Sequence, residues 1–154
     1  MKNQSILIPL LALVLCISLS MLSCDDSDPP DSIFTWNFDG VHDTSTLYFA
    51  SLHNMGTAGE SKIIAGNGYT IYYKDRVCIS LPSLSIGSFA LGVDTMHKLT
   101  YFDDLEFLLA MSGTVNITEH KDKYISGNFS ATLVNSQGTN KSLTGNFLNV
   151  EIFP

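Results

Sequence analysis

The chain has 154 residues, of which 45% are apolar and 15% are charged, and its formal net charge is −7. A chain this apolar can bury a core, which argues against intrinsic disorder, and its excess of acidic side chains argues against a nucleic-acid partner. The length is that of one domain, and 11 glycines and 5 prolines are too few for a collagen-like or low-complexity chain.

Residues 1–23 have the order of a secretory signal peptide. Lys2 precedes an apolar run over residues 6–22, and the segment ends in Met21-Leu22-Ser23-Cys24. This ending resembles a bacterial lipobox, in which a signal peptidase cuts between Ser23 and Cys24 and the cysteine then carries a lipid. Met21 departs from the leucine usual at its position. The alternative is an uncleaved membrane anchor, but about 17 apolar residues with an early proline are at the short limit for a spanning helix.

An acidic spacer follows the cysteine. Residues 25–31 contain four aspartates and two prolines, so we expect residues 24–32 to form an extended tether. An acidic run here resembles the export signal of Bacteroidetes-type surface lipoproteins, whereas in enterobacterial sorting an aspartate directly after the cysteine resembles an inner-membrane retention signal. We expect an exported protein anchored by the lipid on Cys24 to the outer membrane, at the cell surface. Beyond the tether, residues 33–154 contain 7 basic and 11 acidic side chains, an ordinary balance.

The cysteines fit this organisation. Cys16 lies in the signal peptide and Cys24 takes the lipid, which leaves Cys78 alone and the mature chain without an intramolecular disulfide. Cys78 alternates with Val77 and Ile79, so it should lie on the face opposite to theirs, as a structural thiol.

From Ile33 onward, apolar and polar residues alternate with period two, and turn signals recur every eight to twelve residues. Phe34, Trp36 and Phe38 form one apolar face of a first strand, which closes at Asp39-Gly40. Further strands are predicted over residues 46–51, 62–65, 69–73, 76–81 (ended by Pro82), 88–91, 99–102, 124–134 and 143–152.

The C-terminal third predicts a register. Residues 124–134 place these residues on one face: Ile125, Gly127, Phe129, Ala131 and Leu133. Turns centred at residues 121 and 138 would set Ile117 opposite Ile125 and Phe129 opposite Phe147, which keeps the apolar faces together.

Two further local features bear on the strands. The apolar face changes parity between Phe147 and Val150, which predicts a β-bulge near Leu148-Asn149. Residues 105–111 fit either two helical turns or a strand, and the close spacing of the neighbouring strands favours a strand. The fold class predicted is all-β: an antiparallel β-sandwich of eight to ten short strands forming one domain over residues 33–154, with a closed β-barrel as the alternative.

Three segments carry a resemblance: Ser112-Gly113-Thr114, Ser126-Gly127-Asn128-Phe129 and Thr144-Gly145-Asn146-Phe147. Together with the lipobox and the aromatic first strand ending in Asp-Gly, they resemble an uncharacterised family of Bacteroidetes surface lipoproteins. The resemblance implies a small β-domain and the same cellular address, and it implies no activity.

Motifs for chemistry are absent from the sequence. There is no phosphate-binding glycine loop, zinc-protease helix, nucleophile elbow or paired-cysteine site, so no cofactor, metal or catalytic residue is predicted. The histidines are too scattered for one element to bring together: His42, His53, His97 and His120. His42, beside Asp43, is expected to be a solvated loop residue and not a metal ligand. An acidic turn is expected at the surface because it lacks the ligands of a calcium site: Asp103, Asp104 and Glu106.

The aromatic residues supply the binding hypothesis. Tyr48 and Tyr72 are candidates for an exposed platform for sugar rings. Ser32 and Thr95 lie in short patterns that resemble O-glycosylation acceptors of exported Bacteroidetes proteins. We expect a non-enzymatic structural or ligand-binding module whose partner is a glycan or an outer-membrane protein. The alternatives are a carbohydrate-binding accessory lipoprotein and a hydrolase whose site is not recognisable from sequence.

Overall fold

The computed structural model describes residues 31–45, 47–51, 61–67, 74–103 and 106–153. Residues 31–154 form one compact unit. The predictions for the signal peptide, for Ser23 and Cys24, and for the strand over 69–73 with Tyr72 lie outside the described residues. In the described part of the chain, no helix has the length and apolar character needed to cross a membrane.

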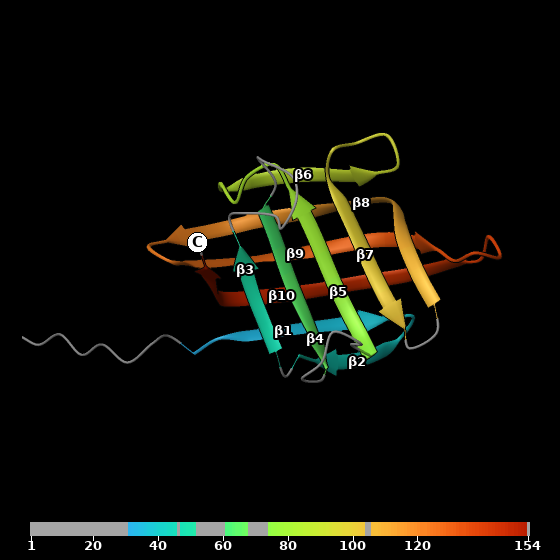
Figure 1. Ribbon diagram of the computed structural model, residues 1–154, viewed down its shortest axis with the longest axis horizontal. Coiled ribbons are helices and arrows are strands. Elements are labelled where there is room, and N and C mark those ends of the chain that lie inside the picture. The colour runs from blue at the N-terminus through green and yellow to red at the C-terminus, as the bar shows by residue number, and fades with distance from the viewer. Residues whose placement is uncertain (1–30, 46, 52–60, 68–73, 104–105, 154) are drawn as a thin grey trace, which may run out of the picture. The chain divides into compact units, whose positions relative to one another are not determined.

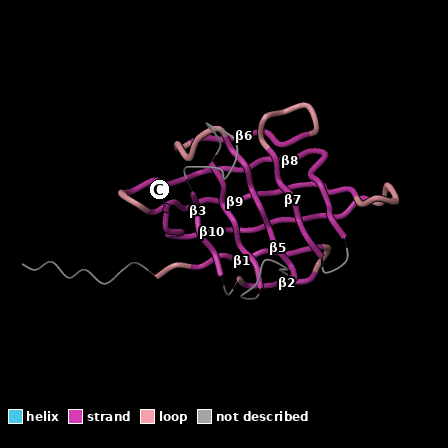
Figure 2. Tube along the Cα trace, in the orientation of Figure 1, coloured by secondary structure: helices cyan, strands magenta, loops and turns pink. Residues whose placement is uncertain are grey.

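The all-β prediction is confirmed (Figure 2). The strands are β1 (Ile33–Phe38), β2 (Val41–Thr44), β3 (Leu47–Ser51), β4 (Ser61–Asn67), β5 (Lys74–Leu81), β6 (Gly87–Gly92), β7 (Lys98–Asp103), β8 (Glu106–Lys121), β9 (Tyr124–Val134) and β10 (Asn140–Phe153). The ambiguous segment is a strand from Glu106 on, as the spacing argument favoured. β2 is a strand that the alternation did not single out.

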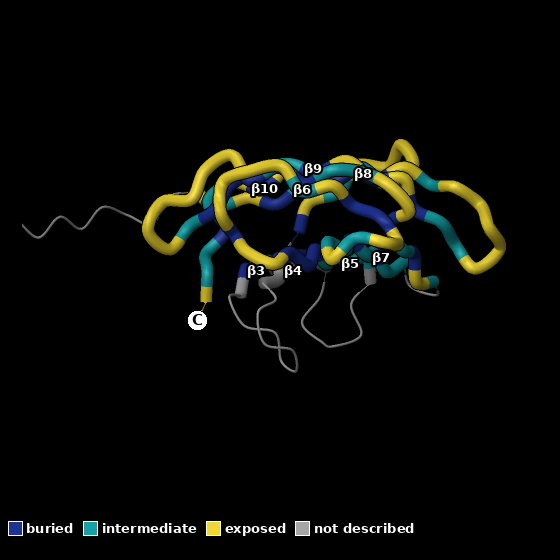
Figure 3. The backbone as a smooth tube through the Cα atoms, turned by 90° about the horizontal axis from the view of Figure 1, so that it is seen from above, coloured by how far each residue is buried: buried dark blue, intermediate teal, exposed yellow. Residues whose placement is uncertain are grey.

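The strands form one hydrogen-bonded sheet that folds over into two layers (Figures 1 and 3). The first layer contains β3, β4, β5, β7 and the start of β8, and the second contains β2, β1, β10, β9, the rest of β8 and β6. The strands of one layer cross those of the other (Figure 1). The described strands therefore form a half-barrel, which is consistent with the predicted sandwich and its barrel alternative.

The two layers are joined at two places. β8 passes from one layer to the other, with a register shift between Ala110 and Ser112 that lets the strand bend. On the other side, β10 and β3 pair in parallel through Ile152 with Ala50 and Phe153 with Ser51. This parallel contact is the exception to the predicted antiparallel pairing.

The predicted bulge is present in β10. The β9–β10 register shifts between Phe147 and Val150, and Asn149 has a φ of 49°, which is left-handed. The faces of β9 are also as predicted, since Phe129, Ala131 and Leu133 are buried and Ser130 and Thr132 are exposed.

The predicted register was wrong by two residues in both hairpins. Phe129 pairs with Gly145 and Phe147 pairs with Gly127, while Ile117 also pairs with Gly127. A Cβ added to either glycine would overlap the phenylalanine ring across from it. Each ring therefore lies over a glycine on the neighbouring strand, which two directly opposed phenylalanines would not allow.

The core lies between the two layers and is rich in aromatic rings. Phe34 stacks on Phe147 with a centroid distance of 5.9 Å and lies 5.8 Å from Phe129 and 6.1 Å from Trp36. All four side chains are at most 2% exposed. Because such burial stabilises by about 25 cal/mol per Å² of apolar area, this cluster is a main source of stability in a domain without a disulfide among its described residues.

Candidate functional site

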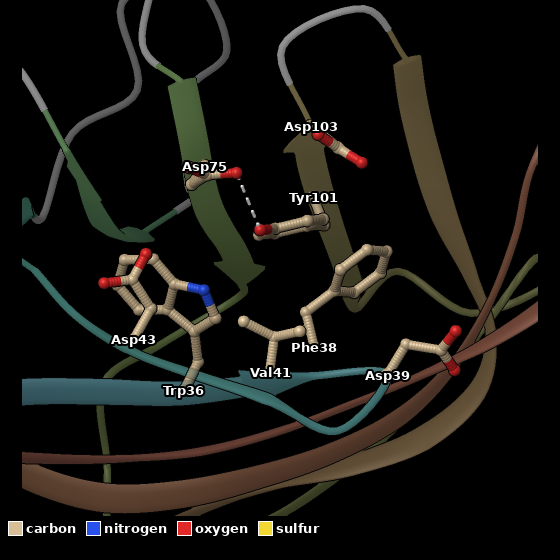
Figure 4. A pocket seen from close by; sticks show the side chains of 8 residues that line it. All are labelled: Trp36, Phe38, Asp39, Val41, Asp43, Asp75, Tyr101 and Asp103. Atoms are coloured by element: carbon tan, nitrogen blue, oxygen red, sulfur yellow. Dashed lines mark hydrogen bonds between the residues drawn. The ribbon is translucent and has the colours of Figure 1, made fainter.

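A cavity of about 350 Å³ opens between the two layers where β1 and β2 face β5 and β7 (Figure 4). Its volume is at the lower end of the range for small-molecule sites. The lining residues are three aromatic, one aliphatic and four acidic: Trp36, Phe38, Tyr101, Val41, Asp39, Asp43, Asp75 and Asp103. This combination of an apolar wall and four carboxylates makes it the candidate site.

Two of the aspartates face the cavity from β5 and β7 (Figure 4). Asp75 has a left-handed φ of 49° where the β4–β5 register shifts, so the alternation of β5 does not extend to it, and its carboxylate accepts a hydrogen bond from Tyr101. On β7, Tyr101 is buried and strand alternation places Asp103, two residues later, on the same side. Arg76 lies on the opposite face, with its guanidinium carbon 4.2 Å from the ring centroid of Phe102.

The two aspartates sit at the same end of the β5–β7 ladder. Arg76 pairs with Phe102, and Asp75 precedes this pair while Asp103 follows it. Both aspartates therefore border the same part of the cavity.

The β1–β2 hairpin supplies the opposite wall. Its two-residue turn, Asp39 and Gly40, has left-handed φ values of 51° and 92°, which suits a tight hairpin. The resulting register pairs Trp36 with Asp43 and Phe38 with Val41, so one face of this short hairpin carries all four side chains toward the cavity (Figure 4).

A buried hydrogen-bond chain holds Asp75. The Tyr101 hydroxyl, in a side chain only 3% exposed, donates to Asp75 Oδ1 over 3.1 Å. Burial and the Asp75 carboxylate raise the pKa of Tyr101 well above its usual range, while a hydrogen bond from Trp36 acts in the opposite direction. Tyr101 thus remains a neutral donor that orients one carboxylate of the site.

Asp39 at the rim is neutralised by a lysine. Lys141 Nζ lies 2.6 Å from Asp39 Oδ2, and this hydrogen bond lowers the pKa of Asp39 and raises the pKa of Lys141. The other lining carboxylates are those of Asp43, Asp75 and Asp103, and none of the described residues that line the cavity is basic. In the described residues, no group of three or more histidine, cysteine or acidic side chains is placed to hold a metal ion, so the carboxylates are spread around the cavity.

The sequence-predicted site residues lie elsewhere. Tyr48 is partly buried against the core and its hydroxyl donates to the backbone carbonyl of Ser32 over 2.6 Å, which disfavours a sugar-stacking role. Ser32 Oγ donates to the carbonyl of Asn149 over 2.6 Å, and Asn149 Nδ2 donates to the carbonyl of Asp31. These bonds fasten the start of the domain to the β10 bulge.

Thr95, the second glycosylation candidate, is also engaged. Its hydroxyl oxygen lies 2.8 Å from the carbonyl of His97 and 3.0 Å from that of Gly92, either of which can accept its proton. A sugar on this oxygen would remove that donor. His42 is exposed, as predicted, but it lies on strand β2 and not in a loop. Nδ1 of His97 and Nδ1 of His120 lie within hydrogen-bond distance of backbone carbonyls.

The prediction for Cys78 is confirmed, and the prediction for the acidic turn is corrected at one residue. Cys78 is partly exposed while its neighbours Val77 and Ile79 are buried, so the predicted faces are confirmed. Asp103 is only partly exposed because it points into the cavity, which corrects its assignment to a surface turn. The other member within the described residues, Glu106, begins β8.

Sequence reasoning missed the cavity, although two signals for it were present. Asp103 has the same parity as the apolar residues of its strand, which marks it as facing inward. A two-residue turn at Asp39-Gly40 would also have placed Asp43 beside Trp36. Bringing the two sides of the cavity together required the closure of the layers. Comparison with family profiles, with curated protein sequences and with solved structures finds no match to this chain.

Proposed function

We propose that this chain is a lipid-anchored, non-enzymatic ligand-binding module held outside the cytoplasm at the outer membrane. The observation that carries the binding role is the cavity between the layers, with its apolar wall and inward-facing carboxylates. Inward-facing charges lower the stability of a small domain, and such residues are typical of sites that function rather than of sites that only pack.

The anchoring half of the proposal comes from the sequence, where a secretory signal ends in Ser23-Cys24 and an acidic tether follows. Its test is fatty-acid labelling in the native host. The wild-type chain should incorporate label and Cys24→Ala should not, while Cys78→Ala serves as the matched cysteine control. Labelling that persists in Cys24→Ala would overturn the lipid anchor.

The binding half is tested by blocking the cavity. Val41 lines it and is 69% exposed, so Val41→Trp adds bulk at the mouth without disturbing the core. In a thermal-shift screen of sugars, amino acids and amines, at least one ligand should stabilise the wild type and fail to stabilise Val41→Trp. The matched control is Val93→Trp, because Val93 is exposed and is not among the lining residues. A screen without any ligand of this behaviour would favour a purely structural role.

A carbohydrate ligand is the second candidate, since carboxylates can accept hydrogen bonds from sugar hydroxyls. The rings favour it less, because Trp36 is 1% exposed and Tyr101 is 3% exposed, so neither offers an open face for stacking. The hydrolase alternative would need a carboxylic acid that holds its proton near neutral pH. The pKa of Asp39 is lowered, which is opposite to what a general acid requires.

A further inference from the structure

We propose that the free edge of β6 is a pairing site for β6 of a second copy of this chain, and that residues 93–98, called the strap, close this site. In the described part of the chain, β6 pairs only with β8 and ends the sheet (Figure 1). An unpaired edge offers backbone donors and acceptors to a strand from another molecule. Three observations carry the proposal: the groups that this edge presents, the contacts that cover part of it, and the apolar residues at its two ends.

Alternate residues of β6 present their backbone groups at the open edge. Side chains of the strap reach the carbonyl oxygens of Ala90 and Gly92, so the backbone groups of these two residues point away from β8. Ser88 has the same parity, and its N–H and C=O therefore point away from β8 as well. Outside the β6–β8 ladder, neither Ser88 nor the N–H of Ala90 forms a hydrogen bond with a described residue. β6 also lacks the charged residues that usually protect an edge strand.

The strap covers the remaining acceptors of the edge with side chains. Nδ1 of His97 lies 2.8 Å from the carbonyl oxygen of Ala90, which can only accept. Lys98 Nζ donates to the carbonyl oxygens of Gly92 and Val93 over 3.1 and 2.7 Å. A partner strand would donate its own N–H groups to the oxygens of Ala90 and Gly92. The strap and a partner strand therefore exclude each other, and the strap must withdraw before the edge pairs.

Exposed apolar residues at both ends of the edge favour a second copy as the partner. Ile86, just before β6, is 63% exposed, and Val93 and Met96 in the strap are 46% and 77% exposed. An antiparallel pair with Ala90 opposite Ala90 of the second copy has a two-fold axis between them, as an isologous dimer requires. This register sets the residue before β6 of each chain opposite the strap of the other. Ile86 then meets apolar side chains at both ends of the pair, which removes them from water.

The test is disulfide crosslinking of the full-length protein, purified in excess detergent, in a Cys78→Ala background. The Cα atoms of a hydrogen-bonded antiparallel pair are about 5.5 Å apart, which is within the range for a disulfide. Ala90→Cys should therefore crosslink two copies at the two-fold axis. The matched control is Thr132→Cys, because Thr132 is exposed on β9, which has a neighbouring strand on each side. The crosslinked fraction is measured on non-reducing gels.

Substitutions in the strap open the site. His97→Ala combined with Lys98→Ala removes the side chains that cover the carbonyl oxygens of the edge. At a protein concentration where the intact strap allows little dimer, this double variant should raise the crosslinked fraction of Ala90→Cys about tenfold, since two side-chain hydrogen bonds no longer compete with the partner. Circular dichroism checks that the double variant keeps its β-sheet. If it does not fold, His97→Ala alone should raise the crosslinked fraction about threefold.

Each outcome decides the proposal. Crosslinking through Ala90→Cys that exceeds crosslinking through Thr132→Cys, and that rises in the strap variants, supports both the pairing site and the strap. Equal crosslinking at the two positions indicates random collision and overturns the pairing site. Crosslinking that is specific to Ala90→Cys but unchanged or lowered in the strap variants overturns the role of the strap. Absence of crosslinking in a folded strap variant overturns the proposal as a whole.

Discussion

Gly145 is the position where the β9–β10 register can be tested by one methyl group. It lies opposite Phe129, and a Cβ added to it would overlap the Phe129 ring and come within 2.5 Å of the backbone oxygen of Thr35. The ring can tilt, but the strand carrying the oxygen cannot retreat without breaking its ladder with β10. Gly145→Ala therefore places a methyl group where one obstacle is fixed.

The magnitude follows from these contacts. Overpacking costs typically about 1–3 kcal/mol, and a fixed backbone obstacle places Gly145→Ala near the upper value, about 3 kcal/mol. For a domain of this size, that corresponds to a fall in melting temperature of roughly 12 °C. The matched control is Gly92→Ala, since a Cβ there meets its nearest atoms at 3.5 and 3.6 Å, which is ordinary contact. It should change stability by no more than about 0.5 kcal/mol.

The assay is thermal and urea unfolding followed by circular dichroism. In the register that the sequence alone suggested, Gly145 would face Ala131 and the added methyl group would be tolerated. A Gly145→Ala protein as stable as Gly92→Ala would therefore refute the structure of this hairpin. If Gly145→Ala does not fold in the wild-type background, a Phe129→Leu background removes the ring contact. There the added methyl group should cost at least about 1 kcal/mol less than in the wild type.

Two more predictions concern stability. Because the pKa of Tyr101 is raised in the folded state, folding holds its proton more tightly, so the stability it contributes is full below the unfolded-state pKa near 10 and is lost as pH rises above it. In urea unfolding, the wild type should lose up to ~1.4 kcal/mol per pH unit above pH ~10 relative to Tyr101→Phe; parallel curves for the two proteins would contradict the burial of this phenol. At the β10 bulge, Asn149→Ala should be about 1 kcal/mol less stable than Asn149→Gly, since alanine is strained at a φ of 49° and glycine is not. Both variants lose the hydrogen bond from Asn149 Nδ2 to Asp31, so this loss does not affect the comparison. Equal stabilities of the two variants would show that residue 149 is not left-handed.

The sequence by itself determined which residues face inward. Period-two alternation set the apolar faces of β1, β5 and β9, Pro82 follows the last residue of β5, and the change of parity located the bulge at Leu148-Asn149. These features depend only on residues that are neighbours along one strand. The alternation of apolar and polar residues determines the two faces of a strand, whichever strand it pairs with.

Register and cavity were decided only by the tertiary structure. A register shift of two residues keeps every apolar side chain on the same face of the sheet, so alternation cannot tell whether Phe129 lies opposite Phe147 or opposite Gly145. The packing of each phenylalanine ring over a glycine distinguishes the two registers. The cavity needs β1 and β2 to meet β5 and β7, which are far apart in the chain. The folding of the sheet into two layers brings their inward-facing aspartates around one space, and that contact between distant strands leaves no pattern in any single segment.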